Sequence, residues 1–136
     1  MTLPLLHELS RQVRSLPLDG LLYEQITEAI AIAVEQWAAD HQWPTRREVL
    51  IEGFRRAFGR ADRGRADLVV ETTDGSVVIE IDRWDKPLSL AKLEHVAEEG
   101  AVPVWIRWDR PVSVAVPDSI FLIHLPVREA TLLGPG

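Results

Sequence analysis

Residues 65–83, RADLVVETTDGSVVIEIDR, constrain the fold of this chain more than any other stretch. Two runs rich in Val and Ile are joined through Asp74 and Gly75, and β-branched residues favour strands. Asp-Gly is the dipeptide that a type I′ turn favours, because both central residues of that turn take positive φ. The stretch therefore predicts a β-hairpin, with strands over residues 66–72 and 76–83.

Three carboxylates interrupt the apolar pattern of this hairpin. Asp67 opens the first run, and Glu80 and Asp82 lie inside the second. The predicted two-residue loop pairs Asp67 with Asp82 and Val69 with Glu80, which brings the three acids to one face of the sheet. Clustered carboxylates are costly to bury without a compensating partner. The pattern predicts a site for Mg²⁺ or Mn²⁺, which prefer oxygen ligands.

Two other interpretations of the acidic cluster stay open at this point. The end of the sheet can be solvated, in which case the carboxylates need no cation. Alternatively, a basic side chain neutralises them, and the candidates are Arg65, Arg83 and Lys92. A slip of the hairpin by one residue is disfavoured, because it would turn Val and Ile side chains toward solvent.

Helical periodicity and capping signals define the elements around the hairpin. Apolar residues recur at helical spacing over residues 20–40, and residues 1–15 form a shorter candidate helix. Ser89 as an N-cap and Gly100 as a C′ glycine bracket a helix over residues 88–99. Two short apolar strands are expected after it, over residues 102–108 and 119–125.

The segment from Thr45 to Phe58 is ambiguous. Thr45 followed by Glu48 is a capping-box pattern, which favours a helix. Alternation of apolar and polar residues favours a strand instead. We expect a strand over residues 48–56, because a hairpin without a neighbouring strand is marginally stable.

The order of these elements predicts one domain, a mixed α/β sheet flanked by helices. A helix between strands 76–83 and 102–108 implies a right-handed crossover and a parallel pair. A chain of 136 residues is the size of a single domain and folds without disulfides or structural metal. Within it, residues 1–19 are expected to be an N-terminal extension and residues 129–136 a flexible tail.

The composition is that of a globular protein, with 46% hydrophobic and 26% charged residues. The absence of cysteine excludes a disulfide framework and a thiolate zinc site, and it fits a reducing compartment. No basic segment precedes an apolar run at the N-terminus, and no apolar run reaches the roughly 18 residues of a membrane span. We therefore expect a cytoplasmic protein with no membrane partner.

The charge of the chain is distributed unevenly. The net charge is −6, yet residues 46–65 hold seven arginines against three acids, which leaves −10 for the remainder. A basic strip beside an acidic cluster is a pattern that nucleic-acid-binding proteins share, and a solvated arginine-rich loop is the alternative.

The carboxylates and their surroundings resemble the PD-(D/E)XK nuclease superfamily, which has the restriction-endonuclease-like fold. Asp67, in GRADLVV, matches the acid that opens the second core strand of that family, and Glu80, in VVIEIDR, matches the acid on the third. The family's αβββαβ core order matches residues 20–108, so the resemblance covers most of the chain. The motif itself is short. The resemblance is also supported by the predicted hairpin, the crossover helix and the VWIRW strand.

The chain departs from the family where the motif lysine is expected, because Asp82 stands there. The resemblance then makes Asp82 a further metal ligand. It also makes Lys92, on the following helix, the candidate for a migrated lysine. Lys86 is the weaker candidate. The family often places a glutamate of the first helix at the metal, so Glu24 and Glu28 join the candidate ligands.

The resemblance implies a metal-dependent nuclease that hydrolyses phosphodiester bonds of DNA, or of RNA as the alternative. Asp67, Glu80 and Asp82 would hold Mg²⁺ or Mn²⁺, which polarises the phosphate and activates a bound water. Lys92 would stabilise charge in the transition state. Phosphates would be contacted by Arg55, Arg56, Arg60, Arg63 and Arg65.

The rival interpretation is a catalytically silent module of the same fold that binds nucleic acid or protein. The missing motif lysine and the small size of the chain favour it. Many nucleases of this fold act as dimers, so the resemblance also implies a homodimer.

Overall fold

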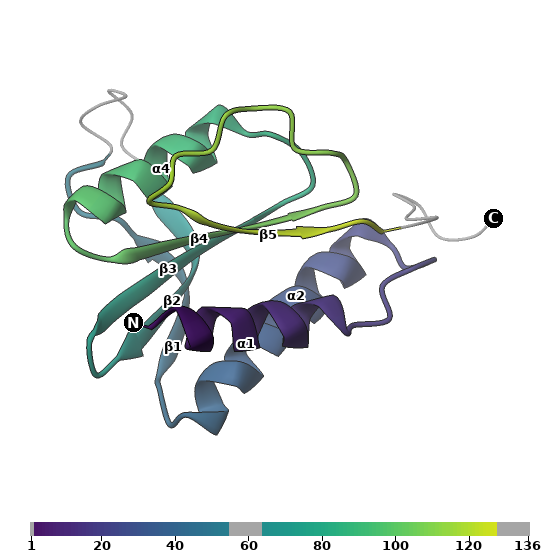
Figure 1. The fold of residues 1–136 in the computed structure, drawn as a ribbon, viewed down its shortest axis with the longest axis horizontal. Coiled ribbons are helices and arrows are strands. Elements are labelled where there is room, and N and C mark those ends of the chain that lie inside the picture. Colours follow the sequence, from purple (N-terminus) through teal and green to yellow (C-terminus); the bar gives the residue numbers. More distant parts are fainter. Residues whose placement is uncertain (1, 55–63, 128–136) are drawn as a thin grey trace.

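Helices and strands follow one another in the order that the sequence predicts. The structure, a computed structural model, describes residues 2–54 and 64–127. The described elements are α1 (Leu3–Arg14), α2 (Tyr23–Asp40), β1 (Thr45–Leu50), β2 (Arg65–Thr72), β3 (Gly75–Asp82), α4 (Pro87–Glu98), β4 (Val102–Trp108) and β5 (Phe121–Leu125). They form a single α/β domain around a five-stranded mixed sheet (Figure 1), so the predicted fold class is confirmed.

The five strands lie side by side in chain order, from β1 at one edge to β5 at the other. Neighbours among β1, β2 and β3 run antiparallel, whereas β3, β4 and β5 run parallel. Helix α4 is the crossover that returns the chain between β3 and β4, as a parallel pair requires. The predicted parallel pairing of these two strands is confirmed.

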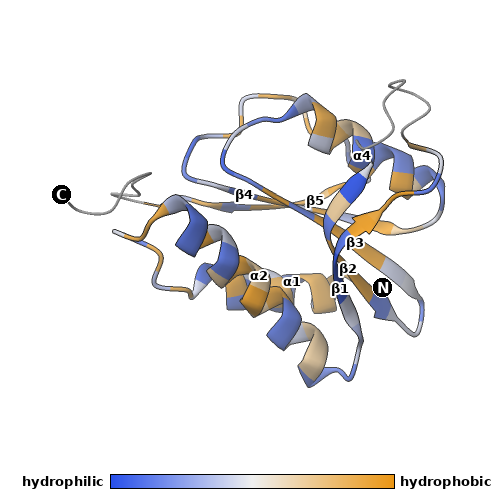
Figure 2. Ribbon diagram, turned by 180° about the vertical axis from the view of Figure 1, so that it is seen from behind, coloured by the Kyte–Doolittle hydropathy of each residue, from blue (hydrophilic) through white to orange (hydrophobic). Residues whose placement is uncertain are grey.

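Helices cover both faces of the sheet, with α1 and α2 on one face and α4 on the other (Figure 1). Alternation along β3 sends Val77, Ile79 and Ile81 into the larger core against α1 and α2. Glu80 and Asp82 occupy the alternate positions and therefore lie on the α4 face. Figure 2 shows hydrophobic residues along the strands and alternating hydrophobic and hydrophilic bands along α1 and α2.

The N-terminal segment contributes to the main core. Leu6, Leu9 and Val13 of α1 are buried in the cluster that also holds the apolar side of α2. The ring of His41, at the end of α2, is hydrogen-bonded to Glu8 at 2.6 Å. The predicted extension over residues 1–19 thus packs on the domain from Leu3 onward, whereas the predicted tail over residues 129–136 lies outside the described residues.

The strand expected over residues 48–56 forms earlier, as β1, so its predicted bounds were wrong. Glu48, with a φ of 52°, lies inside β1 without ending its pairing with β2, and Gly53, with a φ of 78°, lies in the turn that follows the strand. Pairing with β2 ends at Leu50, and the chain then turns. The hairpin still gains the neighbour that it needs, and the alternative helix beginning at Thr45 does not form.

The hairpin is confirmed, but its predicted register was wrong by two residues. Thr72 pairs with Gly75, and Val69 pairs with Val78 rather than with Glu80. Thr72 closes the turn, because its hydroxyl donates to the Gly75 carbonyl at 2.7 Å and accepts the Asp74 N–H at 3.1 Å.

The expected type I′ turn does not form at Asp74-Gly75, because Gly75 alone of the two takes positive φ. A shift of two residues keeps every side chain on its predicted face, since alternation has a period of two. The acids therefore still face α4, but Asp67 is brought opposite Glu80 instead of Asp82.

In the part of the chain that the structure describes, no helix combines the length and the apolar character that a membrane span requires.

Candidate functional site

The backbone ladder between β2 and β3 stops at the position of the predicted acids. Its last pair at this end is Leu68 with Ile79, and Asp67 and Glu80 come next. Their side chains take the place of ladder hydrogen bonds. The Asp67 N–H donates to Glu80 Oε2 at 3.1 Å, and the Ile81 N–H donates to Asp67 Oδ2 at 2.7 Å. The two carboxylates thus lie together where the strands separate.

Glu80 is buried to an unusual degree for an acid, with 1% of its surface exposed. Burial, followed by the neighbouring charge of Asp67, raises the pKa of Glu80 to about 8. The ammonium of Lys92 acts in the opposite direction and favours the ionised carboxylate. Burial and the second acid prevail, so Glu80 holds its proton more tightly than an exposed glutamate does.

Lys92 reaches this pair of acids from α4. Leu93 and Val96 are buried against the sheet and fix the helix over it. The Lys92 ammonium forms an ion pair with Glu80 Oε1, and it donates a hydrogen bond to the Arg65 carbonyl at 2.7 Å. The structure therefore brings together Asp67, Glu80 and Lys92, which we call the acid–lysine centre.

Asp82 lies two positions further along β3 and has different partners. Its Oδ2 accepts the indole N–H of Trp105 at 2.9 Å, and its Oδ1 lies 3.5 Å from the ammonium of Lys86. Among residues 2–54 and 64–127, no group of three or more His, Cys, Asp or Glu side chains is arranged to hold a metal ion. The structure thus brings together two of the three predicted carboxylates and gives the third its own partners.

The predicted glutamates of α2 lie in a different part of the molecule. Glu28 forms two hydrogen bonds with the guanidinium of Arg47 on β1, at 2.8 and 3.0 Å. Hydrogen bonding to Arg47 lowers the pKa of Glu28. Glu24 is exposed in the first turn of α2. The structure places neither glutamate in contact with Asp67 or Glu80.

Of the arginines predicted to contact phosphates, Arg65 alone is described. Its side chain is exposed and donates to the Glu48 carbonyl at 3.2 Å, while its own carbonyl accepts from Lys92. It therefore lies beside the acid–lysine centre. The other four fall outside the described residues: Arg55, Arg56, Arg60 and Arg63.

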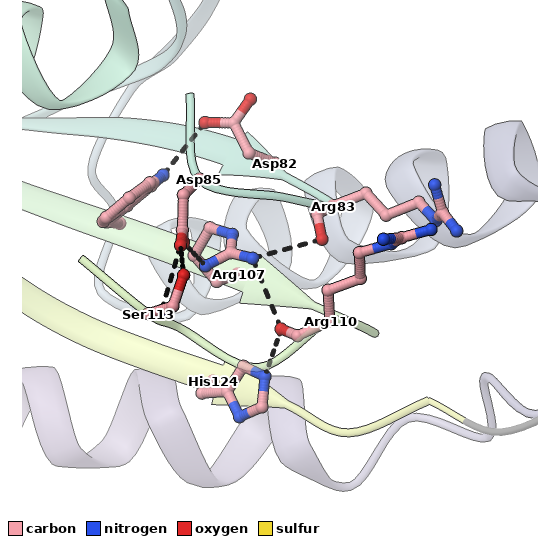
Figure 3. A network of polar contacts seen from close by, with 8 residues as sticks. Asp82, Arg83, Asp85, Arg107, Arg110, Ser113 and His124 are labelled. Atoms are coloured by element: carbon pink, nitrogen blue, oxygen red, sulfur yellow. Dashed lines mark hydrogen bonds and ion pairs between the residues drawn. The ribbon is translucent and has the colours of Figure 1, made fainter. Parts of the chain in front are cut away.

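Sequence reasoning did not foresee a second polar network, which is built around Arg107 of β4 (Figure 3). This arginine is fully buried and forms an ion pair with Asp85, which also accepts the Ser113 N–H at 2.9 Å and its hydroxyl at 2.7 Å. Burial lowers the pKa of Arg107. The available signal was a single arginine inside the apolar run VWIRW.

The acid–lysine centre has a definite chemical capacity. It holds two carboxylates against one ammonium, so its net charge is negative when both acids are ionised. Like charges in close contact are unfavourable, and a divalent cation would relieve that repulsion. Two carboxylates also match the protein ligand set with which Mg²⁺ is commonly bound, the rest being waters and substrate phosphates.

Comparisons with known proteins gave no match. No protein-family model, curated protein or solved structure matches the chain.

Proposed function

We propose that this protein is a metal-dependent nuclease that hydrolyses phosphodiester bonds, with DNA as the first expected substrate. One observation carries the proposal: Asp67, Glu80 and Lys92 come from three elements and meet at one point. Two acids and a lysine are the residue types that the PD-(D/E)XK resemblance calls for. Here the lysine comes from α4 rather than from β3.

The residues present fit a divalent cation. Asp67 and Glu80 would hold Mg²⁺ or Mn²⁺, because both side chains lie at the end of the β2–β3 ladder and a cation would favour the ionised form of Glu80 beside Asp67. Such an ion, when bound, polarises a phosphate and lowers the pKa of a bound water. Asp82, two positions further along β3, would be a further metal ligand. The hydrogen bond that it accepts from Trp105 holds its carboxylate in place.

Lys92 supplies the second positive charge. Its side chain is 11% exposed, and its ammonium is held between Glu80 and the Arg65 carbonyl. If a cation took over the carboxylates, Lys92 would be available to bind a substrate phosphate. A compact charge of this kind stabilises the negative charge that develops on the transferred phosphoryl group.

The proposal is tested by incubating plasmid DNA and labelled oligonucleotides with the protein and Mn²⁺ or Mg²⁺, beside an EDTA control. We expect metal-dependent cleavage that falls at least about 100-fold in Glu80→Gln, Asp67→Asn and Lys92→Met. Matched controls are Glu94→Gln and Arg14→Gln, which remove an exposed α4 glutamate and an exposed basic side chain of α1. Equal loss in both groups, or cleavage that survives Glu80→Gln, would contradict the assignment.

A second function, that of a silent binding module, is favoured by a separate observation. Both acids accept a backbone N–H, and Glu80 also has the Lys92 ion pair, so the protein's own groups already engage both carboxylates. Thermal unfolding with and without Mn²⁺ separates the two functions. A nuclease centre raises the unfolding temperature with metal and loses the increase in Asp67→Asn, whereas a silent module shows no increase.

The homodimer implied by the resemblance stays part of this proposal. Its measurement is the molar mass in solution by light scattering, with and without oligonucleotide.

A further inference from the structure

A hollow lies at the C-terminal ends of β3 and β4, apart from the acid–lysine centre. It has a volume of about 350 Å³ and is lined by Trp84, Asp85, Arg107, Arg110, Pro111 and Ser113. We call it the indole pocket. The segments that follow β3 and β4 supply most of its lining.

The floor of the indole pocket is rigid. Arg107 is fully buried, and its Nη2 donates to the carbonyls of Arg83 and Arg110 at 3.2 and 3.3 Å. Asp85 fastens the loop after β4 through Ser113, and His124 of β5 is hydrogen-bonded to the Arg110 carbonyl at 2.9 Å (Figure 3). The long loop is therefore held in place on three sides.

One polar atom in this floor has no partner. The Nε of Arg107 is buried and makes no hydrogen bond to any described residue. A buried donor without an acceptor is costly, and such groups are uncommon in folded proteins. Arg107 has no exposed surface, so this donor belongs to the packed network that supports the pocket.

The rim of the pocket combines an exposed aromatic ring with arginines. Trp84 is 52% exposed, which is unusual for tryptophan. The guanidinium of Arg83 lies 6.0 Å from the Trp84 ring centroid and 4.3 Å from that of Tyr23. Figure 3 shows Arg83 and Arg110 extending to the same side of the network. Arg83 is paired with Asp109, and Arg110 makes no ion pair with the described residues.

We propose that the indole pocket binds an unpaired nucleotide of the substrate strand, with the base stacked on Trp84 and the adjoining phosphate held by Arg110. An exposed indole flanked by guanidinium groups is the arrangement with which single-stranded nucleic acid is bound, since every base offers a π-face. Arg83 stays engaged with Asp109 and lies close to the Trp84 ring. The pocket volume is in the range of small-molecule sites.

The acid–lysine centre includes a residue of β3, and the pocket includes residues that directly follow β3. Trp84 follows Glu80 by four residues, so their Cα atoms are at most about 14 Å apart. In this proposal, the nucleic acid whose base occupies the pocket runs toward the acid–lysine centre, a few nucleotides away. This inference rests on the proposed function for its choice of ligand, and it adds the substrate class: a strand with an unpaired base.

The test is equilibrium binding of fluorescein-labelled oligonucleotides to the whole chain in EDTA, measured by anisotropy. The probes are a mixed-sequence single strand of DNA, the same strand as RNA, and the blunt DNA duplex. We expect tighter binding to the single strands than to the duplex. Trp84→Ala should weaken single-strand binding about 5- to 150-fold, the range that loss of one stacked base produces. Arg110→Gln should weaken it and make it less sensitive to salt.

Two control variants are needed, one that keeps an aromatic ring at position 84 and one in the loop after β4. Trp84→Phe keeps an aromatic face and should retain affinity within a few-fold. Val114→Ala changes an exposed apolar residue next to Ser113 and should leave binding unchanged. Because Trp84 is exposed, Trp84→Ala should fold, which circular dichroism and a thermal melt verify.

The outcomes separate this inference from the proposed function. Single-strand binding that depends on Trp84, without any cleavage, supports the proposed nucleotide pocket and contradicts the proposed nuclease activity. Cleavage that depends on Glu80 but not on Trp84 supports the nuclease and overturns the pocket. Absence of binding to all three probes by folded wild-type protein also overturns it, and directs the search to protein partners of the same surface.

Discussion

At the scale of single residues, Glu80 is the side chain whose environment departs furthest from that in water. Its pKa is raised to about 8, first by burial and then by the charge of Asp67. In the unfolded chain a glutamate titrates near 4.5. The folded state therefore binds the proton more tightly, and the associated stability is present in full below pH 4.5 and is lost as pH rises through about 8.

The resulting prediction concerns metal-free protein. Urea unfolding in EDTA should give a lower free energy of unfolding at about pH 9 than at about pH 6, by about 2–3 kcal/mol, because Glu80 must ionise while buried. In Glu80→Gln this part of the pH dependence should disappear. Glu94→Gln, on the exposed side of α4, is the matched control and should behave as wild type. A pH profile that is the same in Glu80→Gln and in wild type would refute the account.

At the scale of elements, the turn at Thr72–Gly75 and the loop after β4 decide where functional groups lie. The sequence predicted the hairpin from its Asp-Gly dipeptide, yet the Thr72 hydroxyl closes the turn one residue earlier. That shift places Asp67 beside Glu80. Local dipeptide preference was a sound guide to the hairpin and a poor one to its register, because a side chain competed for the turn's backbone groups.

The position of the loop after β4 likewise depends on a side chain, that of Asp85, which accepts two hydrogen bonds from Ser113. Replacing Asp85 with Ala leaves the Arg107 guanidinium buried without its counter-ion and frees Ser113. We expect a loss of about 3 kcal/mol in the free energy of unfolding. Hydrogen exchange should accelerate over residues 109–120, as read by mass spectrometry.

Asp118→Ala removes an exposed acid of the same loop and is the control for this variant. Unchanged exchange over the loop in Asp85→Ala would show that Asp85 does not anchor it.

At the scale of the whole molecule, the distribution of charge matters more than its sum. A net charge of −6 opposes binding to a polyanion, whereas the five arginines between residues 55 and 65 favour it; Arg46 and Arg47 are engaged with glutamates. Nucleic acid should therefore bind through a limited set of phosphate contacts. Such contacts release counterions, so affinity falls as salt rises.

The salt dependence of nucleic-acid affinity reports how many phosphate contacts the protein makes. A plot of log affinity against log salt for a single strand should have a negative slope. Replacing Arg55, Arg56, Arg60 and Arg63 together by Gln should make the slope shallower by about 0.7 for each phosphate that the protein then leaves unneutralised. Arg11→Gln with Arg14→Gln, on α1, is the matched control. Identical slopes in the two variants would place the phosphate-binding groups elsewhere.

The sequence by itself determined the elements, their order and the α/β class. Periodicity, capping residues and the crossover rule report on local physics and chain connectivity, and these do not depend on distant contacts. It also determined which acids would share a face, because alternation along β3 survives a shift of two residues. The composition alone excluded a disulfide framework, since the chain has no cysteine.

Only the tertiary structure decided which of those residues meet. Lys92 was one of several candidate cations, and the packing of Leu93 and Val96 selected it by fixing α4 over the end of β3. The sequence did not distinguish Asp82 from the other two acids, whereas the structure pairs it with Trp105 of the neighbouring strand. Such contacts join residues far apart in the chain, so their geometry follows from the packing of whole elements and leaves no local pattern in the sequence.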